Sequence, residues 1–243
     1  MPELRLGTAP ERYEVEVRGE YHYYTGDQTR NLFMRALLPF FRGKAGMEAT
    51  FVMFERFRMT PETRDERHAE STETSGGPSQ NNGDVVLTAF FQLLRSERWV
   101  DALFNFGLKT ASGERLVDAR FTDETAYWMD FSVGRDLFRS ENRKYVVRMQ
   151  AMAGFYCWMT NSMKLRQNDA ALFGAGLLGT FDSVSLRSDL TGFVGYMNNG
   201  DRPLMWRNNL RFGYRGHILS LYYTHGMRDS LYDTYAMGYV REF

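Results

Sequence analysis

Apolar and polar residues alternate with a period of two along almost the entire chain of 243 residues. In the stretch RYEVEVRGEYHYY, residues 12–24, tyrosine, valine and glycine share one parity, and glutamate, arginine and histidine share the other. Successive side chains of a β-strand point to opposite faces, so this pattern predicts a strand with one apolar and one ionisable face. Such a strand fits either a soluble sheet, whose ionisable face meets water, or a membrane barrel, whose ionisable face lines a lumen.

The alternating stretches are long for strands. Most run for about 10 to 14 residues, where a globular strand has about 5–6 and a tilted strand needs about 9–11 to cross a bilayer. Their length and number therefore favour an all-β fold, a transmembrane antiparallel barrel of about twelve strands, over a soluble lipocalin-like cup of about eight. The predicted strands lie near residues 12–24, 31–41, 45–60, 85–94, 99–110, 125–136, 144–158, 168–180, 183–197, 203–214, 216–226 and 232–243.

The connections between the predicted strands alternate between long and short. Polar stretches such as TGDQTR, PETRDERHAESTETSGGPSQNNGD and ASGERLVDARFTDE follow odd-numbered strands, whereas RGK, RSER and FRSENR follow even-numbered ones. Outer-membrane barrels have short periplasmic turns and longer extracellular loops. We therefore expect a periplasmic N-terminal segment at residues 1–10, a barrel at residues 11–243, and every long connection outside the cell.

The apolar parity of each predicted strand is the face expected to contact lipid. Tyrosine and tryptophan often stand near the strand ends, as in the aromatic girdles of membrane barrels. Three features depart from this pattern. Glu55 falls on the apolar parity of its strand, Phe54 falls on the inner parity, and the stretch at 168–180 is apolar on both faces.

Composition removes several classes of function. Lys plus Arg and Asp plus Glu number 30 each, so no net charge attracts nucleic acid, and none is expected as a partner. Cys157 is the single cysteine, which excludes an internal disulfide and cysteine-based metal sites, and we expect no cofactor. No apolar run reaches the about 18 residues of a spanning helix, and the polar start MPELRLGTAPER is no signal peptide, so export would require a leader that has been removed.

The end of the chain, YDTYAMGYVREF, resembles the C-terminal signature of bacterial outer-membrane barrels. Tyr235, Met237, Tyr239 and Phe243 share one parity, and the last residue is aromatic. Arg241 departs from the signature, which usually has an apolar residue there. The resemblance implies a location in the bacterial outer membrane, a final strand that is read by the assembly machinery, and outer-membrane lipid or other proteins of that membrane as partners.

Four further stretches resemble an uncharacterised group of outer-membrane barrel proteins from Bacteroidota. They are FRMTPETRDERHAE, LKTASGE, DARFTDETAYWMDFSVGRDL and GYMNNGDRPLMWR. This resemblance implies a barrel and supplies no activity.

Ionisable residues on the inner parity are the candidate functional site. A charged constriction would select solutes, and we expect a narrow pore or uptake channel for small polar solutes. The alternative is a structural or accessory barrel whose lumen is closed by salt bridges, because twelve strands fall between the about eight that side chains fill and the 16–18 that leave a water channel. The candidate lumen residues are Glu14, Glu16, Arg18, Glu20, His22, Arg35, Glu48, Lys109, Arg148, Arg187, Asp189, Arg207 and Arg211.

A lipid-acting outer-membrane enzyme is the other alternative. Ser188, Asn208 and His225 fall on the apolar parity of three strands that should be neighbours. A nucleophile and its base must come within hydrogen-bond reach, and the expected heights of Ser188 and His225 differ. We therefore predict no catalysis. His68 lies with several carboxylates at 62–84, but without ordered ligand spacing, so we expect a solvated loop there and no metal site.

The alternation of connections yields a prediction about topology. Protease added to intact cells should cut within 62–84 and leave the turn at Arg42–Lys44 uncut, because the long polar loop is expected outside and the short turn inside. Gel fragments mapped by mass spectrometry measure this. Cleavage confined to the short turns would show the opposite orientation.

Overall fold

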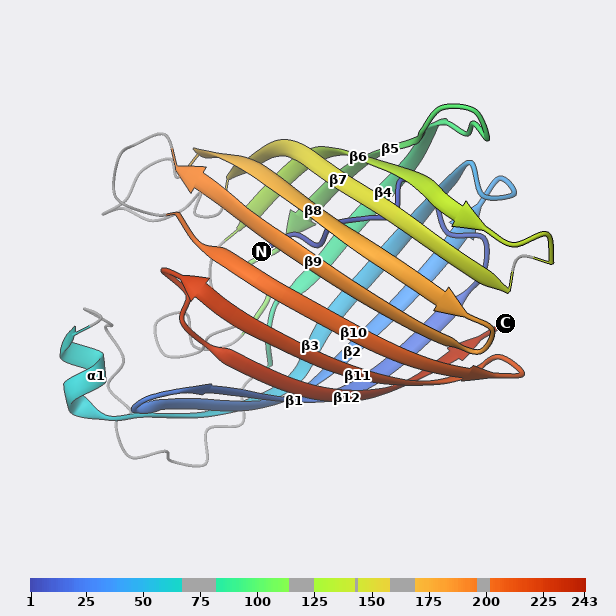
Figure 1. Ribbon diagram of the computed structural model, residues 1–243. Coiled ribbons are helices and arrows are strands. Elements are labelled where there is room, and N and C mark those ends of the chain that lie inside the picture. The colour runs from blue at the N-terminus through green and yellow to red at the C-terminus, as the bar shows by residue number, and fades with distance from the viewer. Residues whose placement is uncertain (67–81, 114–124, 143, 158–168, 196–201) are drawn as a thin grey trace.

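The computed structural model describes residues 1–66, 82–113, 125–142, 144–157, 169–195 and 202–243. Twelve antiparallel strands close into one barrel, as the alternation predicted (Figure 1). Each strand pairs with its neighbours in sequence, and β1 pairs with β12. The strands are β1 (Glu14–Tyr24), β2 (Asp27–Phe40), β3 (Ala45–Met59), β4 (Val85–Leu94), β5 (Asp101–Lys109), β6 (Ala126–Arg139), β7 (Tyr145–Cys157), β8 (Asp169–Phe181), β9 (Val184–Gly195), β10 (Leu204–Tyr214), β11 (His217–Arg228) and β12 (Asp233–Glu242).

The barrel is apolar outside and charged inside, which reverses the arrangement of a water-soluble protein. On β1, Val15 and Val17 are exposed, whereas Glu16 and Arg18, which alternate with them, are buried. Exposed aromatic and aliphatic residues continue around the outer face, for example Phe131 and Leu177. An apolar outer band with polar residues inside is the arrangement that lipid requires of a β-barrel.

Among the described residues, one helix accompanies the barrel. This helix, α1 (Pro61–Glu66), follows β3 at the end of the barrel that carries the long connections (Figure 1). None of the helical segments within the described ranges has the length and apolar character needed to span a membrane.

The first connection is shorter than the sequence predicted. Only Thr25 and Gly26 separate β1 from β2, and Gly26 has a positive φ of 75°. The expectation of a long loop TGDQTR is wrong because Asp27 and Thr29, which resemble loop residues, are fully buried inner-face residues of β2. The other long connections follow odd-numbered strands as expected, but most of the loop at 62–84, with His68, lies outside the described residues.

A β-bulge in β3 explains the displaced polarity of that strand. Leu32 of β2 pairs with Phe54, and the next residue of β2 pairs with Val52, so Met53 is an extra residue on β3. A bulge places two residues of one strand opposite one of its partner, and here Met53 and Phe54 are both exposed on the outer face. As a consequence Glu55 returns to the inside and is fully buried. The expected inward position of Phe54 and outward position of Glu55 are therefore both wrong.

The bulge leads to a prediction about assembly. Deletion of Met53 should preserve the barrel, because the remaining residues would alternate regularly with Glu55 still inside. Deletion of both Met53 and Phe54 should reduce the assembled fraction, because Glu55 would then follow inward-facing Val52 directly and turn toward lipid, with Arg56 and Arg58 turned into the lumen. Heat-modifiable migration on a gel measures the assembled fraction. Equal assembly of both variants would contradict the role given to the bulge.

Candidate functional site: the barrel lumen

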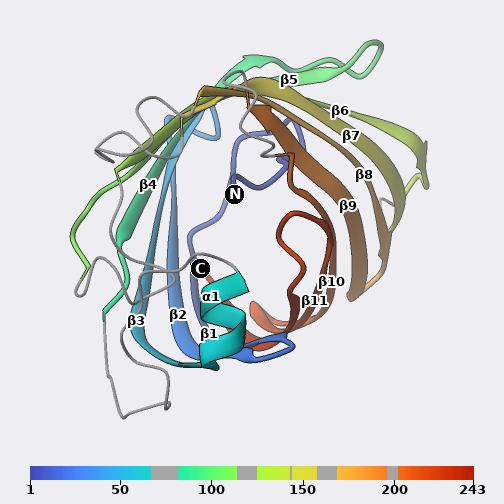
Figure 2. The ribbon, with the colours of Figure 1, turned by 90° about the vertical axis from the view of Figure 1, so that its left-hand side faces the viewer.

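The N-terminal segment, residues 1–13, enters the ring of strands instead of hanging from it (Figure 2). Arginines of three strands donate hydrogen bonds to its backbone carbonyls. Arg148 Nε lies 2.9 Å from the oxygen of Leu6, Arg207 Nη1 lies 3.0 Å from that of Pro2, and Arg187 contacts that of Leu4. A guanidinium offers several hydrogen-bond donors in a fixed plane, so one arginine side chain can bind both the N-terminal segment and the barrel wall. These contacts fix the segment along the inner wall.

Two glycines let the segment approach the wall closely. Gly7 has a positive φ of 80° and packs against the backbone of Gly134 on β6. A β-carbon at position 134 would lie 2.0 Å from the carbonyl oxygen of Leu6 and 2.8 Å from Nε of Arg148. Any larger residue there would therefore displace the segment and its arginine together.

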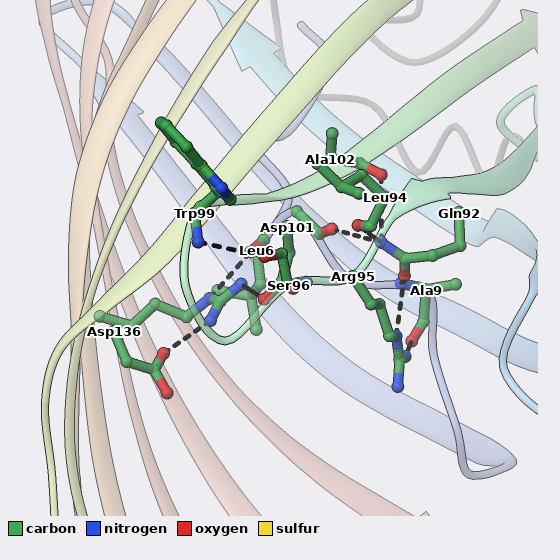
Figure 3. A network of polar contacts seen from close by, with 12 residues as sticks. Leu6, Ala9, Gln92, Leu94, Arg95, Ser96, Trp99, Asp101, Ala102 and Asp136 are labelled. Carbon is green, nitrogen blue, oxygen red and sulfur yellow. Dashed lines mark hydrogen bonds and ion pairs between the residues drawn. The ribbon is translucent and has the colours of Figure 1, made fainter.

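Gln92 of β4 binds the same segment near the short turns (Figure 3). Its Oε1 accepts a hydrogen bond of 2.7 Å from the amide of Ala9, and its Nε2 donates to the carbonyl of Gly7 at 2.9 Å. Nε2 of Gln92 also donates to the carbonyls of Leu94 and Ala102. Gln92 was absent from the predicted lumen residues, since an isolated glutamine carries no sequence signal for a contact 83 residues away.

An apolar cluster holds the far part of the segment inside the barrel. Leu4 is fully buried there, and Leu172 of β8 is 2 % exposed. This packing explains why the stretch at 168–180 is apolar on both faces: one face meets lipid and the other meets Leu4. The buried residues of this cluster are Leu4, Trp128, Met152, Ala170, Leu172 and Phe193.

A network of charges joins the segment to the opposite wall. Arg35 of β2 contacts three carboxylates, with distances of 2.5 Å to Glu14, 2.9 Å to Glu16 and 3.3 Å to Glu48. Glu48 also contacts Arg5 of the N-terminal segment at 2.5 Å. Buried charges are costly unless they are paired, and every one of these carboxylates has an arginine beside it.

Arg18 of β1 is the second centre of the network. Its guanidinium lies 4.0 Å from the ring centroid of Phe33 and 4.3 Å from that of Tyr222, so the two rings enclose it. It contacts Glu20 at 2.6 Å and Glu16 at 3.3 Å. Cation–π contacts strengthen when water is excluded, so the aromatic pair helps to hold this arginine in place.

The network reaches the short-turn end of the barrel through β10. Arg211 Nη2 lies 3.2 Å from Oε1 of Glu14, which connects β10 with β1. Beside it a cavity of about 330 Å³ is lined by inner-face residues such as Ser185 and Gly213, together with Arg12 and Glu242. This cavity forms a polar vestibule at the mouth of the lumen.

Glu3 occupies the space that the network leaves. Its side chain is exposed, although the next residue, Leu4, is fully buried inside the barrel. The positive charges of Arg5 and Arg207 act on its carboxylate, followed by those of Arg18 and Arg187. The carboxylate of Glu3 therefore borders open space and lies within reach of several positive charges.

All thirteen predicted lumen residues belong to the inner parity of their strands, and several form ion pairs. Arg148 lies 2.5 Å from Asp101 of β5, Lys109 lies 3.1 Å from Asp84, which directly precedes β4, and Arg187 lies 2.5 Å from Asp189 of the same strand. Their role in solute binding stays a prediction. Sequence reasoning missed Arg5 and Glu3, because the segment at 1–10 shows no periodicity that assigns it to the lumen.

The residues weighed for lipid hydrolysis lie on the outer face, and the observed contacts separate them. Ser188 Oγ accepts a hydrogen bond of 2.9 Å from Nε1 of Trp206. His225 lies 2.8 Å from Asp233, and its partner across the sheet is Trp206. Within the described ranges no hydrogen bond joins Ser188 to His225, so the geometry lacks the contact between nucleophile and base that hydrolysis requires.

A closed antiparallel barrel with an apolar outer face and a charged lumen defines the class of outer-membrane β-barrel proteins. No protein-family model and no curated protein matches the sequence. The chain is similar in structure to the COG4313 outer membrane channel from Pseudomonas putida F1, with a TM-score of 0.61, 15% identity and coverage of 100% of both chains. It is also similar to the KdgM porin in complex with disordered oligogalacturonate, with a TM-score of 0.57, 9% identity and coverage of 95% of this chain and 99% of that one. At these identities the shared property is the fold.

The close approach at Gly134 gives a test of the segment's position. Gly134→Ala should release the N-terminal segment, because the added methyl would meet the Leu6 carbonyl and Arg148. In a Cys157→Ala background, Leu4→Cys should react slowly with a water-soluble maleimide and at least about tenfold faster after Gly134→Ala. Gly19→Ala is the matched control, since a β-carbon there has nothing within 4 Å. Unchanged labelling in a folded Gly134→Ala barrel would contradict this arrangement.

Proposed function

We propose that this protein is a narrow channel through which small polar solutes cross the bacterial outer membrane. The observation that carries the proposal is the charged inner face of the ring of strands, within which the side chain of Glu3 borders open space. A lumen of this kind replaces the hydration shell of a polar solute with fixed charges and hydrogen-bond donors. The vestibule beside Arg211 is the entrance at the short-turn end.

The pairing of charges supports a preference for small zwitterionic or dipolar solutes. Acids and bases alternate along the connected path from Arg5 through Glu48, Arg35 and Glu14 to Arg211. An ion of either sign meets both attraction and repulsion on this path, whereas a solute with both charges can satisfy both. The N-terminal segment narrows the path further, which supports a small solute.

The comparisons favour transport over catalysis. The two structures described above are named as a channel and a porin. Together with the separation of Ser188 from His225, this supports a protein without enzymatic activity. The four stretches that resemble the uncharacterised Bacteroidota group lead us to propose membership of that group, and the short turns lead us to propose that residues 1–10 enter from the periplasm.

A closed structural or accessory barrel is the second candidate. The observation that favours it is the salt bridge between Arg5 and Glu48, which ties the internal segment to the opposite wall. Fully paired charges inside a barrel can fill it without conducting. Such a barrel would act through other proteins of the outer membrane, so the two candidates differ in conductance.

Planar-bilayer recordings decide between them. Glu16→Gln with Glu20→Gln should shift the permeability ratio toward anions by roughly threefold or more, because Arg18 and Arg35 would lose carboxylate partners and leave positive charge in the lumen. Reversal potentials in a salt gradient measure this ratio. Glu97→Gln with Glu141→Gln removes the same charge from exposed turns and should leave the ratio unchanged.

The same recordings contain the outcome that would overturn the channel. Negligible conductance of the wild type, the Glu16→Gln with Glu20→Gln variant and Gly134→Ala, all shown to be folded by heat-modifiable migration, would leave the closed structural barrel as the function. Conductance that appears only in Gly134→Ala would show a channel that the N-terminal segment closes.

A further inference from the structure

Three arginines stand together on the outer face of the barrel, where the proposed channel does not use them. They are Arg30 on β2 and Arg56 and Arg58 on β3, and all three side chains are exposed. They lie toward the end that carries the long connections, close to the turn between β1 and β2 (Figure 1). Together they form the outer arginine cluster.

The register of the strands forces two of these charges together. Arg30 is the direct partner of Arg56 across the β2–β3 pair, and Gln28 is the partner of Arg58. Like charges directly opposite each other on one face of a sheet destabilise the pairing. The arrangement is therefore unfavourable unless something negative lies over it.

The protein itself does not supply that negative charge in the described part of the chain. Arg30, Arg56 and Arg58 make no ion pair there, and Arg30 has only the ring of Tyr21, at 5.6 Å. The neighbouring acids of the same strands, Asp27 and Glu55, are fully buried on the inner side. Although Asp27 and Glu55 are close to the arginines in the sequence, their carboxylates therefore lie on the opposite face of the sheet.

The position of the outer arginine cluster along the barrel wall indicates which part of the membrane lies beside it. On β2 the outward residues from Phe40 to Leu32 are all apolar, and Arg30 is the next outward residue. On β3 the cluster follows directly after the outward pair Met53 and Phe54. Charges that begin where the apolar band ends lie at the level of lipid headgroups.

We propose that the outer arginine cluster binds the phosphate groups of a lipid anchored in the outer leaflet. Guanidinium groups match phosphate oxygens through paired, charge-assisted hydrogen bonds. One phosphate between Arg30 and Arg56 removes their mutual repulsion, and Arg58 is placed for a second phosphate on the same headgroup. The site is independent of the proposed channel, because it lies on the outer face.

Binding of bis-phosphorylated lipid A to the full chain in neutral detergent tests the proposal, with native mass spectrometry as the readout. Arg30→Gln with Arg56→Gln should weaken binding by about tenfold or more, since charge-assisted contacts are lost. Arg42→Gln with Lys44→Gln is the matched control: it removes two exposed charges from the opposite end of the same β2–β3 pair and should retain wild-type binding.

Two further measurements distinguish a lipid headgroup from free phosphate as the ligand. Lipid A without its phosphates should bind at least about tenfold more weakly than the phosphorylated form. Inorganic phosphate at equal concentration should not displace the lipid, because it lacks the anchor in the apolar band.

The thermal midpoint of unfolding distinguishes lipid binding by the three arginines from a purely structural role. In neutral detergent without lipid A, Arg30→Gln with Arg56→Gln should raise the midpoint, because the repulsion is gone. With lipid A, the wild type should gain more than this variant. Equal lipid binding by wild type and variant, equal loss in the control, or full displacement by inorganic phosphate would overturn the proposal.

Discussion

Closure of the sheet is the constraint on which the rest of this structure depends. Within a bilayer an unpaired backbone N–H or C=O has no water to bond, so a sheet in lipid can have no free edge. The pairing of β1 with β12 removes both edges. Once the ring is closed, every strand has one face toward lipid and one toward a confined interior. The buried charges of Glu16 and Arg18 follow from that geometry, as do the exposed valines that alternate with them.

The confined interior explains why the charges are paired so thoroughly. Arg35 serves three carboxylates, and Arg18 lies between two aromatic rings and two acids. The N-terminal segment takes part in the same pairing. Its backbone carbonyls accept hydrogen bonds from arginines of the wall, and its own Arg5 forms an ion pair with Glu48. The charged part of the interior is therefore one connected network, beside the apolar cluster around Leu4. Open space borders the side chain of Glu3 within this interior, and the proposed channel would pass there.

One bulge links the two faces of the barrel. The extra residue Met53 keeps Glu55 inside, and it also keeps Arg56 and Arg58 outside. A regular strand with the same residues would send Glu55 to lipid and both arginines into the lumen. The outward position of Arg56 and Arg58 in the outer arginine cluster and the inward position of Glu55 thus share a single structural cause. This connects a proposed lipid contact with the lining of a proposed channel without any contact between them.

Alternation by itself determined the strand count, the antiparallel barrel and the inward position of all thirteen candidate lumen residues, because period-two facing is a local property of extended backbone. Tertiary structure alone decided which acid meets which base, since pairs such as Arg211 with Glu14 depend on how the ring closes. It also decided the tight turn at Thr25 and Gly26, the return of Glu55 to the inside, and the place of residues 1–10. The N-terminal segment has no periodic pattern from which its position could be predicted. Its position depends on a glycine in β6, an arginine in β7 and an apolar patch formed by β6 to β9. These elements come together only when the barrel exists.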